Sequence, residues 1–484
     1  DGPRRASGCR RGPRSRTGRG ELPSTRVVER MAGVARVAIV GGGIGGLALA
    51  RALGRAGLDA HIYEQAASFS SSAGAGFILQ PNGAACLQAI GLSRSEVEKL
   101  VHPLRTVTLL GAGGRVVGSS SAFGEISEQF AQPLGGVLRA ELVDMLARPL
   151  VEQQRISYSC NVASVRQTSD GVTATLSTGE EILADILIGA DGVHSITAGA
   201  IDSAREELRR ESPLPPMLRF HPAPLGSNAT ERERVFYGVI LDLERPFAHP
   251  HLGLPHHLLE DLSHGEFISY GLGLGRDQNA EGGGPCRALM WMQTVRVPGG
   301  HDATEEWAAA RDPAKATEAL NHFLSRAPFA PGHPIFEAAA RTAPSRARSF
   351  SISARALRDP DAWHHGRICL LGDAAHSTLP YTAQGLNMAI EDALVLSECL
   401  AGPSAHVEEA FEAYTRRRHA RTTSCAAQAE ANAALLRSRS ATLDRWRDSL
   451  LGAVVSGGLL QRTLAAQIEG GPVPLGPAAV DDRK

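Results

Sequence analysis

The sequence predicts an α/β fold made of two interleaved parts and a helical C-terminal region. A glycine-rich turn at residues 41–46 joins a short buried strand to a helix near the start of the chain. A second buried strand, residues 367–371, runs into another turn and helix late in the chain. Between them, residues 200–350 hold alternating apolar and polar runs, which are typical of an antiparallel sheet. Because the two turn-and-helix segments enclose the alternating region, we expect the first part to be discontinuous.

The composition indicates a globular protein with small-molecule partners. At 484 residues, 43% hydrophobic and 21% charged, the chain is long enough to bury the cores of two domains. Its net charge of -1 gives no basic surplus for binding nucleic acid. The seven cysteines are scattered without a CxxC pair or zinc-like spacing, so we expect no metal site and a reducing, cytoplasmic location. No apolar run approaches the roughly 20 residues of a membrane-spanning helix. The oligomeric state is left open.

The first 33 residues are predicted to be a disordered basic extension. Residues 1–30 carry nine arginines against three acidic residues, and they lack apolar periodicity. Met31, directly before the first strand, resembles a natural start, which favours a non-native extension. The alternatives are an organelle transit peptide and a basic binding arm.

Residues 37–64 have the pattern of a βαβ unit that binds a dinucleotide. The pattern consists of a buried strand at 37–40, a helix at 47–55 and a second strand at 61–64. Glycines between strand and helix let the backbone approach a pyrophosphate, whose charge is met by the amides and dipole of the helix start. Glu64 ends the second strand, where a carboxylate can accept hydrogen bonds from an adenosine ribose. A turn that only packs is the alternative. The predicted turn contacts are Gly41, Gly43, Ile44, Gly45 and Gly46.

Four later segments, in their order along the chain, resemble those of a known flavoenzyme family. They lie at residues 74–83, 138–146, 184–195 and 372–392. Together with the first turn they are similar to the single-component FAD-dependent monooxygenases, the aromatic-ring hydroxylases that include salicylate and urate hydroxylases. The resemblance spans roughly residues 34–430 and is thin in the alternating region. It implies a Rossmann-like FAD-binding domain of the GR2 type, interleaved with an antiparallel-sheet substrate domain and followed by C-terminal helices.

The resemblance also implies a role for individual residues. Gly76 would pass beside the flavin ring, Arg139 would reach the cofactor, and Asp373 would bind the ribityl chain. The alternatives, from the residues alone, are a solvated helix residue for Arg139 and a strand-end cap for Asp373. The remaining implied cofactor residues are the Asp-Gly motif, which is otherwise a plain turn, and the stretch around the late helix: Asp191, Gly192, Pro380, Gln384, Gly385, Leu386 and Asn387.

The start of the late helix is expected to stabilise reduced flavin. Gln384 and Gly385 open that helix, so its free amides and positive dipole end would meet the anion around flavin N1 and O2. Two positions depart from the family pattern. Ala383 stands where the family usually has glycine, and no arginine follows Ser195.

The alternating region is expected to roof the flavin and hold the substrate. Its predicted strands are Arg234–Leu243, Glu266–Leu274 and Arg287–Val297. Aromatic residues on these strands are pocket candidates, although each is more often a core residue: Tyr237, Tyr270 and Trp291.

The predicted domain organisation follows from these segments. Helices are expected at Ala393–Leu400 and Val407–Leu436, and the basic run Arg416–Arg418 is interpreted as a solvated helix face. We predict an FAD-binding domain at 34–200 and 352–400, a substrate domain at 201–351, C-terminal helices at 401–470 and a tail at 471–484.

The resemblance implies a specific reaction. NADH or NADPH would reduce FAD, O2 would add at flavin C4a, and the hydroperoxide would insert one oxygen atom into a small aromatic or heterocyclic substrate. The protein would supply positioning and water exclusion, so no catalytic residue is named. His376 and Tyr381 are candidates for a general base only because of their position in the late segment. Two alternatives remain: a reductase of isoprenoid double bonds with the same fold, and an escort protein that binds prenylated partners without FAD. Asp373 argues against the escort protein, which has no use for a ribityl carboxylate.

Overall fold

The structure is a computed structural model of the chain. It describes residues 36–69, 76–111, 114–211, 231–241, 256–262, 267–272, 288–298, 313–325, 334–342, 347–352, 358–402, 406–436 and 441–475. The predicted extension at 1–33 therefore lies outside the described residues, as does the tail beyond residue 475.

A six-stranded sheet forms the first part of the fold. Its central strand β1 is buried at all four positions and pairs in parallel with β2 and β12. The glycine-rich turn leads from β1 into α1, and β19 extends the sheet from the late segment. The strands are, in sheet order, β18 (His364–His365), β19 (Ile368–Leu370), β12 (Ile186–Gly189), β1 (Val37–Val40), β2 (Ala60–Tyr63) and β8 (Ile156–Ser157).

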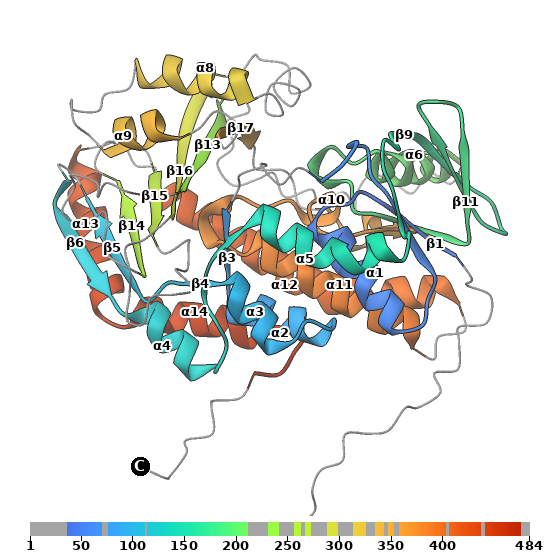
Figure 1. The fold of residues 1–484 in the computed structure, drawn as a ribbon, viewed down its shortest axis with the longest axis horizontal. Coiled ribbons are helices and arrows are strands. Elements are labelled where there is room, and N and C mark those ends of the chain that lie inside the picture. The colour runs from blue at the N-terminus through green and yellow to red at the C-terminus, as the bar shows by residue number, and fades with distance from the viewer. Residues whose placement is uncertain are drawn as a thin grey trace, which may run out of the picture.

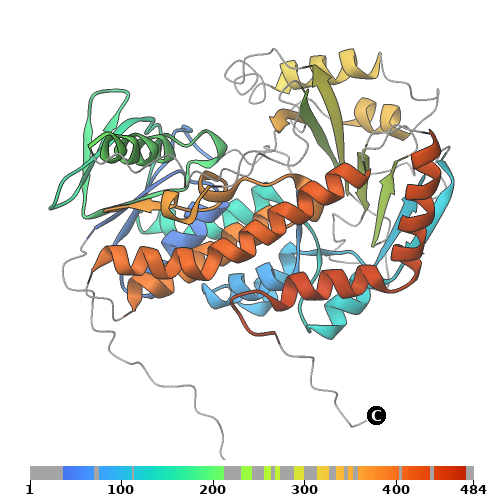
Figure 2. The same cartoon turned by 180° about the vertical axis from the view of Figure 1, so that it is seen from behind.

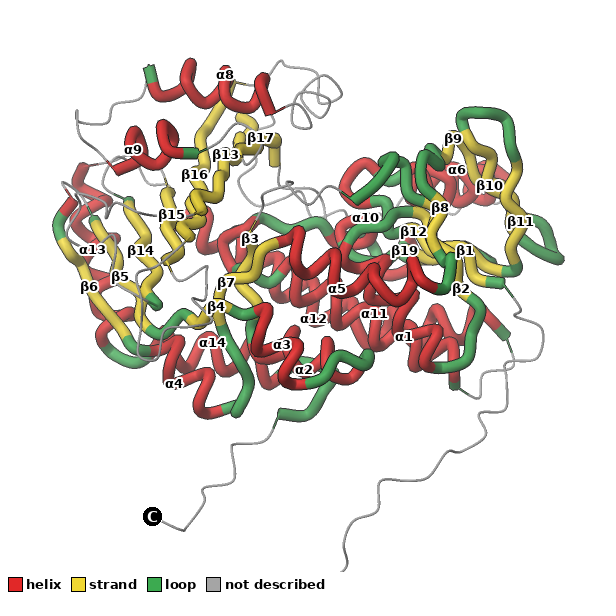
Figure 3. The backbone as a smooth tube through the Cα atoms, viewed as in Figure 1, coloured by secondary structure: helices red, strands yellow, loops and turns green. Residues whose placement is uncertain are grey.

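A seven-stranded sheet forms the second part, at the opposite end of the molecule (Figures 1 and 3). The three predicted strands correspond to β13, β15 and β16. The prediction missed β14 and β17, and also β5 and β6, which reach this sheet from an earlier stretch of the chain. The sheet order is β17 (Ala347–Ile352), β13 (Glu231–Leu241), β16 (Ala288–Pro298), β15 (Phe267–Leu272), β14 (His257–Asp261), β5 (Thr106–Leu110) and β6 (Val116–Ser120).

Two small antiparallel sheets complete the strands of the described residues. The first lies beside the six-stranded sheet and the second leads toward the seven-stranded one (Figure 3). They consist of β11 (Glu181–Ala184), β10 (Val172–Leu176) and β9 (Val162–Gln167), and of β3 (Gly76–Leu79), β7 (Gly135–Leu138) and β4 (His102–Pro103).

Helices lie between the two large sheets and around their outer sides (Figure 1). The bounds are α1 (Ile44–Arg55), α2 (Pro81–Ala89), α3 (Arg94–Leu100), α4 (Ala122–Gln129), α5 (Arg139–Glu152), α6 (Ile196–Glu211), α8 (Pro313–Leu324), α9 (Pro334–Arg341), α10 (Asp373–His376), α11 (Gly385–Ala401), α12 (Val407–Leu436), α13 (Ala441–Ser456) and α14 (Leu459–Glu469). Short 3-10 turns occupy Gly192–His194, Pro360–Ala362 and Pro380–Thr382.

Helices α11 and α12 connect the two parts. Helix α11 packs against α1, α2 and α12, and it is buried along most of its length. Helix α12 has the predicted bounds and runs along the back of the molecule toward the seven-stranded sheet (Figure 2). The α/β fold class is confirmed, whereas the exact division into domains stays a prediction. No helix of the described residues is long and apolar enough to cross a membrane.

Candidate cofactor site

The glycine-rich turn has the shape that a phosphate group requires. Gly41 has a φ of +106°, and a Cβ there would lie 2.4 Å from the Ala190 oxygen. A Cβ on Gly46 would lie 2.1 Å from the Gly41 oxygen, so these two glycines permit close packing. Gly43 differs, because no atom lies within 4 Å of its Cβ position. It precedes Ile44 at the start of α1, which has no side-chain cap. The open space in front of this helix start fits a pyrophosphate.

Glu64 lies beside this turn, at the end of β2. Its carboxylate accepts hydrogen bonds from the Gly42 amide at 2.6 Å and from the Ala66 amide at 2.8 Å. These bonds fix the carboxylate next to the turn, although Glu64 follows Gly42 by 22 residues along the chain. The predicted ribose contact stays a prediction, and the position of Glu64 is compatible with it.

Strands β3 and β7 bring Gly76 and Arg139 together. Gly76 pairs with Leu138, the residue before Arg139, and Arg139 opens α5 with a half-buried side chain. A Cβ on Gly76 would lie 2.1 Å from the Met290 sulfur of β16. Gly76 therefore marks a place where the cofactor part touches the seven-stranded sheet.

The turn after β19 places Asp373 at the surface, next to the six-stranded sheet. Gly372 has a φ of +63°, and its amide donates to Asp392 Oδ2 at 3.1 Å. Asp373 follows as the first residue of α10 and is exposed, whereas the next three residues are buried. The carboxylate is thus held on a turn that follows directly from the central sheet.

The side chains that open α11 bind to the protein rather than face outward. Gln384 is fully buried and donates to Gln80 Oε1 at 2.7 Å. Asn387 is fully buried too, accepts from the Gln80 amide at 3.0 Å and donates to the Ile78 oxygen at 3.2 Å. Helix α11 has no side-chain cap, so its first turn has amides to offer to an anion. Gly385 and Leu386, in that turn, are half-buried.

Ala383, the residue that stands in place of the family's glycine, has a φ of +52°. This left-handed conformation costs an alanine about 1 kcal/mol, which explains a preference for glycine there. The strained residue lies between the 3-10 turn that begins at Pro380 and the start of α11.

The Asp191 carboxylate is engaged by its own loop. It accepts from Ser195 Oγ at 2.5 Å and from the Thr197 amide at 3.1 Å, which anchors the start of α6. Gly192 has a φ of +75°, so the turn itself requires glycine. A contact of Asp191 and Gly192 with the cofactor stays a prediction.

His376 and Tyr381 have very different surroundings. His376 is buried, stacks on Trp363 with ring centroids 5.1 Å apart, and bonds through Nε2 to Asp392 Oδ2 at 2.5 Å. Its Nδ1 has no partner among the described residues. Tyr381 instead donates from its hydroxyl to Thr294 Oγ1 of β16 at 3.1 Å. Tyr381 therefore joins the α11 side of the molecule to the seven-stranded sheet.

Trp291 is a core residue rather than a pocket residue. It is fully buried and donates from Nε1 to Thr342 Oγ1 at 2.8 Å. Tyr270 pairs with Trp291 across the sheet, and Tyr237 pairs with Met292. At Tyr237 and Tyr270 the structure describes the backbone pairing only, so their assignment to the substrate pocket stays a prediction.

A buried charge network behind α11 was missed by the sequence analysis. Arg418 is 1% exposed and bonds to Asp392 Oδ1 and Glu391 Oε2, each at 2.6 Å. The prediction that Arg416–Arg418 forms a solvated face is thus wrong for Arg418, although Arg416 and Arg417 are exposed. Three consecutive helical positions span about 200° of the helix circumference, so they do not share one face. That spacing was the available signal.

Opposing effects act on the Asp392 carboxyl. Burial alone raises its pKa, but the charges of His376 and Arg418 and their hydrogen bonds outweigh burial and lower the pKa to about 2. Asp392 is therefore a carboxylate throughout the physiological pH range.

Glu260 on β14 is a second acid in apolar surroundings, with a half-buried side chain, and the sequence did not point to it. Leu258 and Leu262, two positions before and after it, are each 1% exposed, and alternate strand positions share a face. Leu258 belongs to an apolar cluster with residues of α4 and α14, and Leu262 to one with residues of α12 and α13, so this face lies between two apolar clusters. Burial raises the pKa of Glu260 to about 7, and no charge among the described residues offsets it.

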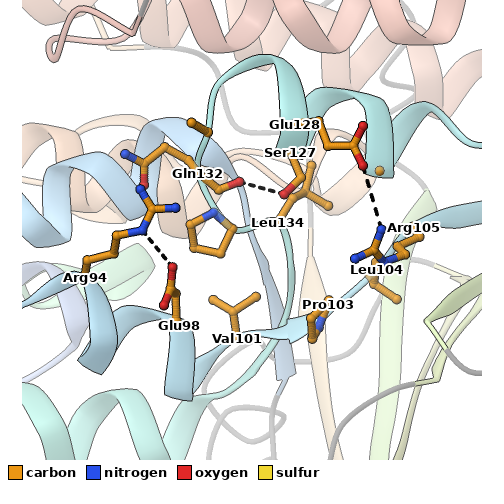
Figure 4. A pocket seen from close by; sticks show the side chains of 13 residues that line it. Arg94, Glu98, Val101, Pro103, Leu104, Arg105, Ser127, Glu128, Gln132 and Leu134 are labelled. Atoms are coloured by element: carbon orange, nitrogen blue, oxygen red, sulfur yellow. Dashed lines mark hydrogen bonds and ion pairs between the residues drawn. The ribbon is translucent and has the colours of Figure 1, made fainter. Parts of the chain in front are cut away.

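A surface pocket of about 290 Å³ lies apart from these residues, between α3 and α4 (Figure 4). Its charged side chains pair with each other: Arg94 with Glu98 at 2.7 Å and Arg105 with Glu128 at 3.9 Å. None of the predicted cofactor residues lines it. Likewise, the described residues contain no group of three His, Cys, Asp or Glu side chains that could hold a metal ion.

Two segments of the chain match a known protein family. Residues 34–215 and 333–429 match the family described as FAD binding domain. Both matched segments contain predicted cofactor residues, and together they cover more than half of the chain.

Individual relatives are consistent with this match. The chain is 29% identical to the FAD-dependent monooxygenase paxM of Penicillium paxilli, over 75% of this chain and 69% of the relative. It is 28% identical to the 3-amino-4-hydroxybenzoate 2-monooxygenase PtmB3 of Streptomyces platensis, over 78% and 83%. Among solved structures, Klebsiella pneumoniae HpxO complexed with FAD and uric acid has a TM-score of 0.68 at 21% identity, over 90% of this chain and 97% of that one. That structural likeness supports the fold.

Proposed function

Because the chain belongs to the FAD binding domain family and has FAD as its cofactor, we propose that it is an NAD(P)H-consuming monooxygenase. It would insert one oxygen atom of O2 into a small aromatic or heterocyclic substrate. Bound FAD supplies the chemistry in such an enzyme, taking a hydride from the nicotinamide and activating oxygen. Two of the proteins named above support this class of substrate: PtmB3 is named a 3-amino-4-hydroxybenzoate 2-monooxygenase, and HpxO is complexed with uric acid.

The observation that carries the proposal is the contact between the α11 start and the seven-stranded sheet. Tyr381 reaches Thr294 of β16 immediately before α11, and Gly76 approaches Met290 of the same strand. An uncapped helix N-terminus thus lies beside the sheet that is proposed to hold the substrate. The chain's own task there is to hold the flavin and the substrate against each other.

The apolar cluster around Tyr381 is suited to excluding water. It unites Leu379 and Tyr381 with Leu109 of β5 and with Ala429 and Ala433 of α12. Partly buried Met292 packs against this cluster from β16. A dry chamber strengthens polar contacts to the reacting groups and protects reactive species from water. We assign no general base, because His376 faces the interior of the protein.

The proposal is tested by the stoichiometry of the purified, FAD-loaded protein. Candidate phenols and N-heterocycles are screened with NADH and with NADPH for compounds that accelerate nicotinamide oxidation. We expect O2 uptake to rise with the same compound, and isotopically labelled O2 to place one labelled atom in the product. Equal nicotinamide oxidation with and without O2, with a product that gains hydrogen instead of oxygen, would establish the reductase alternative.

A further inference from the structure

The carboxylates of Glu391 and Asp392 lie in the middle of α11 and are fully buried. Arg418 of α12 bonds to both, to Asp392 through Nε and to Glu391 through Nη1. Its Nη2 donates to the Met388 oxygen at 3.3 Å. All three nitrogens of the guanidinium group are thus used by one turn of α11.

The first branch of this network leads to the late cofactor turn. Asp392 receives Arg418 on Oδ1, and on Oδ2 it receives the Gly372 amide at 3.1 Å and His376 at 2.5 Å. Gly372 and His376 flank Asp373, which is predicted to hold the ribityl chain. One carboxylate therefore fixes both sides of that residue.

The second branch leads to the start of α11. Glu391 Oε1 accepts from Asn82 at 2.7 Å, and Asn82 also donates to Gln384 Oε1 at 3.1 Å. Gln384 is the residue before the first turn of α11, whose amides are expected to face the flavin. Arg421 also bonds to Glu391, through both carboxylate oxygens at 2.7 Å. The Glu391 branch consequently keeps the Arg421 guanidinium when Arg418 is removed, whereas Asp392 keeps only His376 and the Gly372 amide.

Packing alone does not account for such a network. Buried ion pairs often contribute no more stability than well-packed apolar residues of the same volume, because their desolvation offsets the attraction. What a charged network adds is a fixed geometry for every group bonded to it. Here the bonded groups are two segments of the cofactor site that come from different parts of the sequence.

We propose that Arg418 is a positioning residue for FAD. It fixes the turn at Asp373 through Asp392, and it supports the flavin-facing start of α11 through Glu391. Arg418 itself is too deeply buried behind α11 to be part of the predicted cofactor contacts. The inference depends on FAD binding and is independent of the substrate and of the reaction proposed above.

The test measures FAD binding rather than turnover. Arg418→Met, Arg418→Lys and Asp392→Asn are compared with wild type after removal of FAD and reconstitution. Lysine keeps the charge but lacks the planar fork that reaches both carboxylates. The matched control is Arg417→Met, because Arg417 is the neighbouring residue and pairs at the surface with Glu398. Flavin fluorescence gives the Kd, and the visible spectrum and midpoint potential report the flavin environment.

We expect Arg418→Met to weaken FAD binding on the order of tenfold, as misplacing one buried hydrogen-bonding partner does. Its midpoint potential should move to more negative values, because the α11 amides stabilise anionic reduced flavin less well. Arg418→Lys should show a smaller loss, and Asp392→Asn a loss of the same kind as Arg418→Met. Arg417→Met should bind FAD like wild type.

The proposal is overturned by variants that fold but bind FAD normally. If Arg418→Met does not fold, the decision rests on Arg418→Lys and Asp392→Asn. A lowered Tm with unchanged Kd, spectrum and potential in the folded variants would make Arg418 a purely structural residue. Because no substrate is added, this result is separate from any failure to find monooxygenase activity.

Discussion

The cofactor part and the seven-stranded sheet each hold an acid among packed residues, and the pKa values of the two acids shift in opposite directions. Asp392 on α11 is surrounded by cationic and hydrogen-bonding partners, and its pKa is lowered to about 2. Glu260 on β14 is flanked by buried leucines, and burial raises its pKa to about 7. The comparison teaches that burial does not determine the charge of a carboxyl. The partners that the fold brings to it do.

The largest expected effect comes from removing the cation of the first region. Arg418→Met should lower the free energy of unfolding by about 3 to 5 kcal/mol at neutral pH, because it leaves the buried Asp392 with only His376 and the Gly372 amide as partners. The exposed Arg417→Met should change it by less than about 1 kcal/mol. Urea denaturation of the two variants measures the difference.

The stability that the Arg418–Asp392 ion pair contributes should depend on pH in a defined way. The folded-state pKa of Asp392 is depressed to about 2, so its stabilising contribution is present above the ordinary value of 3.8 and is lost as pH falls through 2. The stability gap between wild type and Arg418→Met should therefore narrow from pH 4 downward. A gap that stays constant down to pH 2 would show that lost packing, rather than lost charge pairing, destabilises the variant.

The next largest effect is on FAD affinity, and it distinguishes a residue of the predicted cofactor site from the buried charge network behind α11. Asp373→Ala should weaken FAD binding by about 1 to 3 kcal/mol, or roughly 5- to 150-fold, because a buried cofactor hydroxyl loses its acceptor. Since Asp373 is exposed in the protein, the Tm without FAD should change little. Equilibrium binding and a thermal scan of the FAD-free protein measure the two quantities. Unchanged binding would mean that the ribityl contact is misplaced.

Removing the charge of the second region should stabilise the protein. The folded-state pKa of Glu260 is raised from 4.5 to about 7, so the protein loses stability as pH rises through this interval. Glu260→Gln should then gain on the order of 1 to 2 kcal/mol over wild type between pH 5 and pH 8. Denaturation at the two pH values measures the gain, with exposed Glu469→Gln as control. A gain that is independent of pH would show that Glu260 does not titrate in this range.

The smallest effect concerns the strained residue between the regions. Ala383→Gly relieves a left-handed alanine but increases the flexibility of the unfolded chain. We expect a net stabilisation below about 1 kcal/mol, measured as a small rise in Tm. A lower Tm would indicate that the Ala383 methyl group contributes to packing.

Short-range patterns were sufficient to predict much of this protein. The glycine turn, the βαβ order, the bounds of α12 and the late Gly372–Asp373 turn all depend on neighbouring residues, through helix and strand periodicity and glycine conformations. These features predict a cofactor site at the ends of β1 and β19. The unusual Ala383 was also visible in the sequence, and its φ gives the reason.

Only the tertiary structure decided which buried groups meet. Strands β5 and β6 join a sheet whose other strands begin more than a hundred residues later, and Asn82 bonds to Glu391 across 309 residues. Helical spacing separates Arg418 from its two neighbours but does not show which of the three arginines is buried, and nothing local distinguishes Glu260 from an exposed glutamate. Local preferences fix the conformation of a segment, whereas the charge and pairing of a buried side chain depend on the surfaces that pack against it, and those come from distant parts of the chain.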